Sequence, residues 1–256
     1  MTKIKRQPIK PRQQEILVLL HKFRFLNRKQ IQSLLNHKYH RLVQEWLNEL
    51  ILKKYISQFY DNKVAPQPAV YSLDKNGRRY LRKTEKIRPR KTGWRDAKLS
   101  QVFRDHCLFL ANINLSLLAL TTKNKTTLDF KTKTELAGIK HLIQPPPDAF
   151  FSIKGKAGAK RYFLDVFDDI PPIALRKRVK QYFEYFDSDE WQDNTGKPFP
   201  EVILICPNNR IKGHLYYFIQ NKIDDDSELV FYLATHEEIK IKGLGRDSLH
   251  KVVEKE

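Results

Sequence analysis

Residues 145–167 read PPPDAFFSIKGKAGAKRYFLDVF and contain two short apolar runs that each carry one aspartate. Asp148 opens the first run, and Asp165 lies within the second. Short apolar runs of this kind predict β-strands. Two carboxylates that project from adjacent strands towards one point can bind Mg²⁺, which activates water and screens a phosphate. Asp148 and Asp165 are therefore candidate catalytic and metal-binding residues.

Strand-like and helical runs alternate around this stretch. Such alternation predicts a sheet that helices cover on at least one face. The tail after Thr235 has no pattern that predicts an element. The predicted elements are a helix at 99–121, strands at 126–134, 148–153 and 161–167, a helix at 171–186, a strand at 201–206, a helix at 213–223 and a strand at 228–235.

Positive charge is concentrated in the first part of the chain, which has a net charge of +19 over 256 residues. Residues 1–100 contain 25 Lys and Arg against 7 Asp and Glu, and the remainder contains 23 against 22. A polyphosphate backbone is the commonest partner for such an asymmetry, because binding releases condensed counterions. Anionic lipid is the rival, but the basic part lacks a strongly amphipathic lysine-lined helix. Double-stranded DNA is the favoured partner.

Three short helices are predicted in this basic part, followed by a two-stranded hairpin. The third segment, 39–56, has paired apolar residues every four positions, which predicts one continuous buried stripe. The hairpin at 55–73 contains two prolines in its loop, which is typical of an exposed tip. The order of elements resembles the winged helix-turn-helix family. The apolar stripe of the third helix consists of Leu42, Val43, Trp46, Leu47, Leu50 and Ile51.

In a winged helix the third helix enters the major groove with its N-terminal residues nearest the bases. The resemblance places base-reading residues at the start of this helix and phosphate contacts at the start of the second helix, in the wing and in the helix that follows. The candidate DNA-binding residues are Tyr39, His40, Arg41 and Gln44 for the bases, with Glu45 beside them, and Arg28, Lys29, Lys63, Arg78 and Arg79 for the phosphates.

Composition restricts the remaining function classes. The longest apolar stretch, at 107–120, is short and interrupted by asparagines, so we expect no membrane span. The basic N-terminus is followed by no signal-peptide core, and we expect a cytoplasmic protein. Cys107 and Cys206 each lie in an apolar run, so we interpret them as buried small hydrophobic residues.

The second part of the chain, 99–256, resembles the PD-(D/E)xK nuclease superfamily in its element order and in the positions of Asp148 and Asp165. That resemblance implies a lysine two residues after the second acid, where this chain has Phe167. Lys160, Lys177 and Lys180 are candidates for a migrated lysine, and Lys180 is taken as the candidate catalytic residue. The acid expected in the first helix is a glutamate, whereas this helix contains Asp105.

The two parts together resemble the replication-relaxation family of plasmid and mobile-element proteins. The resemblance rests on the winged helix, a basic linker at 83–98, and the motifs DHCLFLANINL, PDAFFSI, FLDVFDD and KQYFEYF. His106 and Tyr182 also occupy family positions, although a core role is preferred for both. The resemblance implies an α+β protein with a winged helix at 1–82 and a nuclease-like domain at 99–256.

Three functions are open at this point, and one of them, a plain transcription regulator whose second domain senses a ligand, has no pocket signature in the sequence to support it. The favoured one is a DNA-binding protein of a mobile element, with a degenerate nuclease-like domain and with replication or transfer proteins of the same element as partners. A homodimer is compatible with it. The alternative is a Mg²⁺-dependent endonuclease targeted by the winged helix. Asp148 also has a purely structural reading, as a turn residue that follows three prolines.

Overall fold

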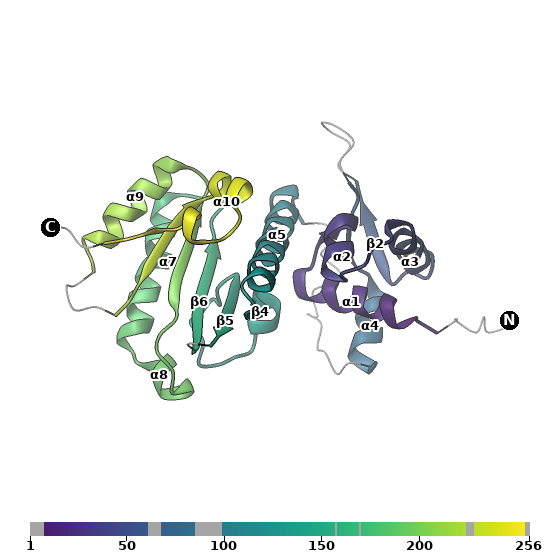
Figure 1. Cartoon of the computed structure of the whole chain (residues 1–256), viewed down its shortest axis with the longest axis horizontal. Coiled ribbons are helices and arrows are strands. Elements are labelled where there is room, and N and C mark those ends of the chain that lie inside the picture. Colours follow the sequence, from purple (N-terminus) through teal and green to yellow (C-terminus); the bar gives the residue numbers. More distant parts are fainter. Residues whose placement is uncertain are drawn as a thin grey trace. The chain divides into compact units, whose positions relative to one another are not determined.

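The protein is a mixed α and β chain, described here by a computed structural model (Figure 1). The structure describes residues 8–60, 68–84, 99–156, 158–168, 170–223 and 228–253. The chain divides into two compact units, residues 1–111 and 112–256. This division falls inside the long helix α5 (Gln101–Lys123). Most of the linker expected at 83–98 lies outside the described residues.

The first unit consists of short helices and a three-stranded antiparallel sheet in the order β1-β3-β2. The three predicted helices and both hairpin strands are present. Strand β1 was not predicted, because two residues are too short for a periodic pattern. The elements are α1 (Pro11–Phe23), β1 (Leu26–Asn27), α2 (Arg28–Leu34), α3 (His40–Leu52), β2 (Ile56–Phe59), β3 (Val70–Leu73) and α4 (Lys75–Thr84).

Helix α2 begins at a capping box. The side-chain oxygen of Asn27 accepts a hydrogen bond from the amide of Gln30 at 2.9 Å. Gln30 in turn accepts one from the amide of Asn27 at 3.1 Å. These two bonds satisfy amides that a helix start leaves without partners. Asn27 is a residue type that favours this N-cap position.

The buried face of α3 is narrower than the sequence pattern predicted. Val43, Leu47 and Leu50 are fully buried, and they repeat at the spacing of one helix face. Leu42, which was expected in the same stripe, is 39% exposed. A residue adjacent to Val43 is rotated by about 100° around the helix axis, and here that rotation carries it out of the core.

The N-terminal half of α5 contributes to the core of the first unit. The rings of Phe25 and Phe103 meet edge to face at 6.3 Å. The Arg104 guanidinium lies 4.5 Å from the centre of the Phe59 ring. Cys107 is buried in the same cluster, as predicted for an apolar cysteine.

A six-stranded sheet in the order β4-β5-β6-β7-β8-β9 forms the centre of the second unit. β4, β5 and β6 are antiparallel, β6, β7 and β8 are parallel, and β9 is antiparallel to β8. The tail that the sequence could not place forms α10 and β9. After α5 come β4 (Thr127–Thr132), α6 (Lys133–Leu136), β5 (Ala149–Gly155), β6 (Gly158–Val166), α7 (Pro172–Asp187), α8 (Glu190–Thr195), β7 (Glu201–Cys206), α9 (Asn209–Gln220), β8 (Phe231–Thr235), α10 (His236–Lys242) and β9 (His250–Lys251).

Successive side chains of β6 point to opposite faces of the sheet. Phe163 belongs to the main apolar cluster, which also contains Leu175 and Val179 of α7 and Leu215 of α9. Helices α7 and α9 therefore cover this face of the sheet (Figure 1). Tyr162 faces the opposite side. None of the helices in the described ranges is long and apolar enough to cross a membrane.

Candidate functional site

Asp148 and Asp165 lie side by side at the ends of β5 and β6. The antiparallel register pairs Ala149 with Leu164, so the two aspartates occupy the next opposed positions. The amide of Asp148 donates to Asp165 Oδ1 at 3.2 Å, and the amide of Val166 donates to Asp148 Oδ2 at 3.0 Å. Each carboxylate is thus fixed by the backbone of the other strand. The structure brings together the two acids that the sequence singled out.

Helix α7 brings a cation and a phenol to the same carboxylate. Arg178 Nε lies 2.7 Å from Asp165 Oδ2. The Tyr182 hydroxyl donates to the same oxygen at 2.8 Å. Arg178 also donates from Nη1 to the carbonyl oxygen of Pro145 at 2.8 Å, just before Asp148 in the chain. The guanidinium therefore joins α7, the proline turn and β6 at one point.

The protonation of Arg178 and Tyr182 is fixed by burial and by charge. Burial is the largest single cause and acts to lower the pKa of Arg178, but the charge and hydrogen bond of Asp165, together with the interactions with Tyr182 and Asp148, outweigh it, and the pKa is raised. Burial is also the largest cause that raises the pKa of Tyr182 well above its ordinary value, and the Asp165 carboxylate adds to it. Arg178 is a permanent cation and Tyr182 a permanent neutral donor across the physiological pH range.

The donors around the two carboxylates do not fit a bound Mg²⁺. Asp165 accepts hydrogen bonds on both oxygens. The oxygens of Asp148 face the Val166 amide and, at 3.4 Å, the ammonium of Lys133. A divalent cation prefers free carboxylate and water oxygens, and here it would compete with a guanidinium already in contact. In the described part of the chain, no group of three His, Cys, Asp or Glu residues could hold a metal ion.

The lysines proposed as migrated catalytic groups lie elsewhere. Lys180 and Lys177 are exposed on α7. Lys160 is exposed on β6 and has the same strand parity as Tyr162, so it faces away from α7. Phe167 is buried in the main apolar cluster, which explains why that position carries no lysine. The structure does not bring any of these three lysines to the aspartate pair.

Arg178 and Tyr182 are the site residues that the sequence interpretation missed. Leu175, Val179 and Tyr182 are buried and mark the inner face of α7. Arg178 lies three residues after Leu175 and four before Tyr182, so helical spacing places it next to that face. That spacing was readable in the sequence and separates Arg178 from Lys177 and Lys180. The preferred core role of Tyr182 is correct for its ring, but its hydroxyl is part of the site.

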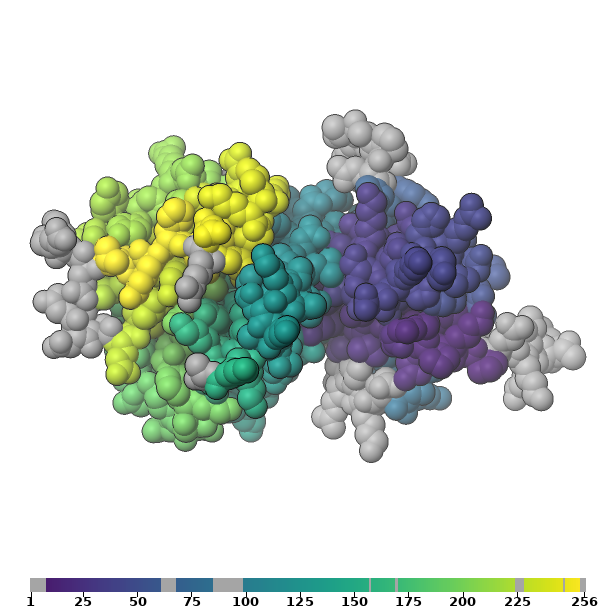
Figure 2. Space-filling model, viewed as in Figure 1, coloured from purple at the N-terminus to yellow at the C-terminus, as the bar shows by residue number. Residues whose placement is uncertain are grey.

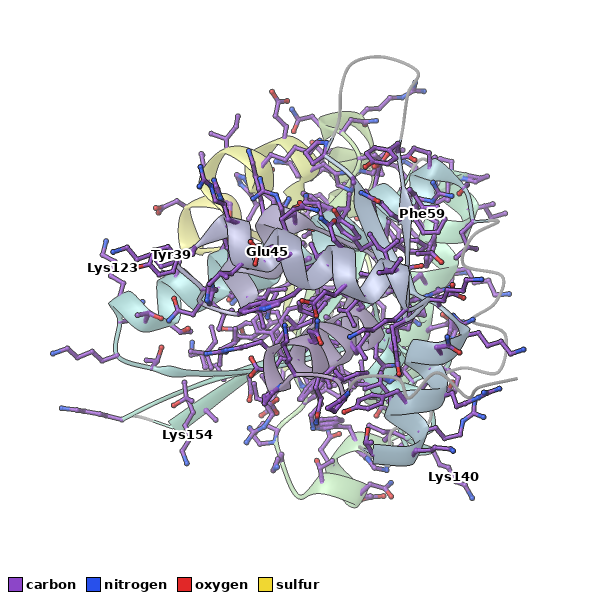
Figure 3. All side chains as sticks on the ribbon, turned by 90° about the vertical axis from the view of Figure 1, so that its right-hand side faces the viewer. Tyr39, Glu45, Phe59, Lys123, Lys140 and Lys154 are labelled. Carbon is purple, nitrogen blue, oxygen red and sulfur yellow. The ribbon has the colours of Figure 1, made fainter. Side chains whose placement is uncertain are left out.

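The first turn of α3 presents the predicted base-reading residues. His40 and Arg41 are exposed, and Tyr39 is 61% exposed. Figure 3 labels Tyr39 and Glu45 on this helix. Gln44 is only half-exposed and donates to Asn48 Oδ1 at 2.9 Å. The exposed surface of the helix is therefore formed mainly by Arg41, Glu45 and Asn48, and Gln44 contributes less to it.

The predicted phosphate-binding residues differ in their environments. Lys29 and Arg79 are exposed, and Arg28 is half-exposed at the start of α2. Arg78 donates from Nη1 to the carbonyl oxygen of Leu73, which ties α4 to the end of β3. Lys63, in the expected wing, lies outside the described residues. Asp105 is exposed on α5 and accepts a hydrogen bond from Gln101 at 2.9 Å.

Solved structures with a detectable likeness to the chain are distant. The crystal structure of RV1404 from Mycobacterium tuberculosis is 20% identical and has a TM-score of 0.28, with 46% of this chain and 74% of that chain covered. The restriction endonuclease FokI is 12% identical with a TM-score of 0.36, and the match covers 93% of this chain. FokI bound to DNA is 13% identical with a TM-score of 0.30. The chain spans less than half of the FokI chain, 45% and 43% in the two structures.

Sequence comparison gives a clearer result. No curated protein matches the chain. The profile of the Replication-relaxation family matches residues 17–202, which is well over half of the chain. The match covers most of the first unit and continues through β4, β5, β6 and α7 into β7. This confirms the resemblance inferred from the motifs, and the chain belongs to the Replication-relaxation family.

Proposed function

We propose that the chain is a sequence-specific duplex-DNA-binding protein of a plasmid or other mobile element, and that it acts in replication, transfer or their regulation. The DNA contact is made by a winged helix within the first unit. Family membership supports the biological setting. The basic charge of residues 1–100 supports an anionic polymer as the partner.

One observation carries the proposal: the arrangement of α2, α3 and the β1-β3-β2 sheet. The helices and strands follow the order of a winged helix, including a short strand between the first two helices that pairs with the last strand. The first turn of α3 is exposed at Tyr39, His40 and Arg41, as a helix that inserts into a groove requires. Exposed cations flank it at Lys29 and Lys38.

Different residues of this surface have different roles in the proposal. Arg41 reads a base edge, because a guanidinium can donate two hydrogen bonds to guanine in the major groove. Glu45 lies one turn further along the helix and discriminates by accepting from cytosine or by repelling phosphates from a wrong register. Lys29, Arg28 and Arg79 hold the backbone and carry no sequence information.

The test uses the full chain and duplexes selected from a random library. Binding should weaken steeply with salt, with a log–log slope of several units. Arg41→Ala should reduce discrimination by about 1–3 kcal/mol at the contacted base pair, and Lys29→Ala should weaken selected and random duplexes alike. Arg12→Ala is the matched control, since Arg12 is an exposed arginine of α1 that is paired with Glu15 at 2.7 Å.

Two results would refute this assignment. If the full chain does not bind duplex DNA at low salt, the function is wrong. If Arg41→Ala and Arg12→Ala have the same effect on discrimination, α3 is not the reading helix.

The second unit, in this proposal, does not cut DNA. Its aspartate pair is engaged by Arg178 and Tyr182 instead of being open to a metal and a water molecule. The unit then serves for contacts with replication or transfer proteins of the same element, or for additional grip on DNA. The adjacent positions of Asp148 and Asp165 are what the endonuclease alternative requires, but the contacts of Arg178 and Tyr182 with Asp165 favour a unit that does not cut.

A further inference from the structure

A cavity of about 530 Å³ opens on the face of the sheet that α7 and α9 leave uncovered. Its walls are apolar: Leu117 and Leu120 of α5, Phe151 and Tyr162 of the sheet, and Leu244 of the segment after α10. All of these residues belong to the second unit. The volume lies within the range of roughly 300–1,000 Å³ that is usual for small-molecule sites.

Two lysines line the same cavity, Lys156 and Lys160, near the tip of the β5–β6 hairpin. Lys160 of β6 is directly opposite Ile153 of β5. Directly opposed residues share a face of the sheet, so Lys160 and Ile153 both lie on the cavity side. Of the described residues that line the cavity, none is acidic. The cavity therefore combines an apolar interior with positive charge at one end.

The wall formed by residues 243–249 is held in place by hydrogen bonds. The Ser248 hydroxyl donates to the carbonyl of Gly243 at 2.8 Å and accepts from the amide of Gly245 at 3.1 Å, and its side chain is buried. The amide of Leu244 donates to the Ser116 hydroxyl of α5 at 3.2 Å. Figure 2 shows this C-terminal segment in yellow beside the teal α5. The cavity is consequently formed before any ligand enters, which lowers the entropic cost of binding.

We propose that this cavity binds a small amphipathic anion of the alkyl carboxylate class. The alkyl chain lies between α5 and the sheet, and the carboxylate lies at Lys160, with Lys156 beside it. A purely apolar ligand would leave the lysine charge unused, and a purely polar anion would leave the apolar walls in contact with water. This inference is independent of DNA binding by the first unit.

The first experiment measures displacement of 1-anilinonaphthalene-8-sulfonate from the full chain by a series from hexanoate to tetradecanoate, each below its micelle concentration. The Kd should fall about fourfold for each added methylene and then level off when the cavity is full. The 1-alkanols of equal length should bind about tenfold more weakly, because they lose the charge-assisted hydrogen bond.

Variants then locate the site. Lys160→Glu should weaken the carboxylates about tenfold and leave the 1-alkanols unchanged. Lys154→Glu is the matched control, because Lys154 belongs to the same hairpin and pairs with Ala159, on the other face of the sheet. Figure 3 labels Lys154. Leu120→Trp should fill the cavity and abolish binding of both the carboxylates and the 1-alkanols. If that variant does not fold, the comparison of Lys160→Glu with Lys154→Glu still shows whether the carboxylate binds in the cavity.

The proposal is overturned if no carboxylate displaces the probe from the wild-type chain. It is also overturned if Lys154→Glu weakens binding as much as Lys160→Glu, since the effect would then be general electrostatics. A Kd that keeps falling with chain length without levelling off would indicate adsorption to the surface and would equally refute a site. Displacement by an acidic apolar peptide, with no effect of the carboxylates, would identify the face as a protein contact.

Discussion

Nε of Arg178 lies 2.7 Å from Oδ2 of Asp165, and the two side chains are only 11% and 6% exposed. The negative charge of the buried Asp165 carboxylate is therefore balanced by the guanidinium of Arg178. A buried ion pair gains little over a well-packed apolar pair, because both charges lose their hydration. Removal of one partner is different, since it leaves the other charge buried and unpaired.

Arg178→Ala should lower the free energy of unfolding by about 3–5 kcal/mol, the usual effect of breaking a buried ion pair. Urea denaturation of the full chain measures this change. Lys180→Ala is the control, because Lys180 is exposed on the same helix and should change stability by less than about 0.5 kcal/mol. Equal effects of the two substitutions would show that the Arg178–Asp165 contact has no energetic importance.

The purified protein should not nick supercoiled plasmid with Mg²⁺ or Mn²⁺. Cleavage needs a group that handles the proton of the attacking water and the charge on the phosphate. The groups beside the pair, Lys133, Arg178 and Tyr182, are already in contact with the two carboxylates. Wild type and Asp165→Asn should give the same background on an agarose gel. Nicking by the wild type that Asp165→Asn removes would restore the endonuclease alternative.

Glu238 should make stability depend on acidity. Partial burial acts to raise its pKa, but hydrogen bonds from Lys212, at 2.7 Å, and from Thr235 outweigh burial and lower the pKa to about 2. A carboxyl whose pKa is lower in the folded chain stabilises it above its unfolded value of 4.5, and this contribution is lost as the pH falls towards 2.

Glu238→Gln should therefore lower the Tm at pH 7 and have a vanishing effect near pH 2. Thermal unfolding across this range measures the difference. Glu237→Gln is the control, since Glu237 is the exposed neighbour on α10. A Tm difference that does not change with pH would contradict the assigned ion pair.

Gly77→Ala should destabilise the first unit by about 1–3 kcal/mol. A Cβ at this position of α4 would overlap the carbonyl oxygen of Tyr55, which is backbone and has no freedom to move away. Gly213 in α9 is the matched control, because a Cβ there meets nothing within 4 Å. Gly213→Ala should stabilise the chain by up to about 1 kcal/mol, through helix propensity alone. Denaturant unfolding of both variants gives the comparison.

Patterns that repeat over several residues made much of this fold predictable from the sequence. The Asn27 cap, the strands around Asp148 and Asp165, and α7 each have a local signal that several positions share. β1 has two residues and exists because it pairs with β3, a long-range contact that no local pattern encodes. Leu42 was wrongly predicted to lie in the buried stripe of α3, because neighbouring apolar residues on a helix cannot all face a narrow core.

The acids of the candidate site were predicted from the sequence, whereas its cation, Arg178, was missed although the helical spacing of α7 points to it. Asp148 and Asp165 were predicted because each lies in a strand-like apolar run. The resemblance to nucleases then implied that the cation would be a lysine. Arg178 belongs to a run of four cations within five residues, Arg176 to Lys180, and composition cannot rank them. The buried positions of Leu175, Val179 and Tyr182 distinguish Arg178, and they become certain only when the sheet is in place.

Strand β6 serves two unrelated surfaces with residues that alternate along a single backbone. Asp165 belongs to the side that α7 covers, and Lys160 and Tyr162 belong to the cavity. Insertion or deletion of one residue between Tyr162 and Asp165 would exchange the two sides for everything beyond it. The spacing of this segment should therefore tolerate far less evolutionary change than its individual side chains do.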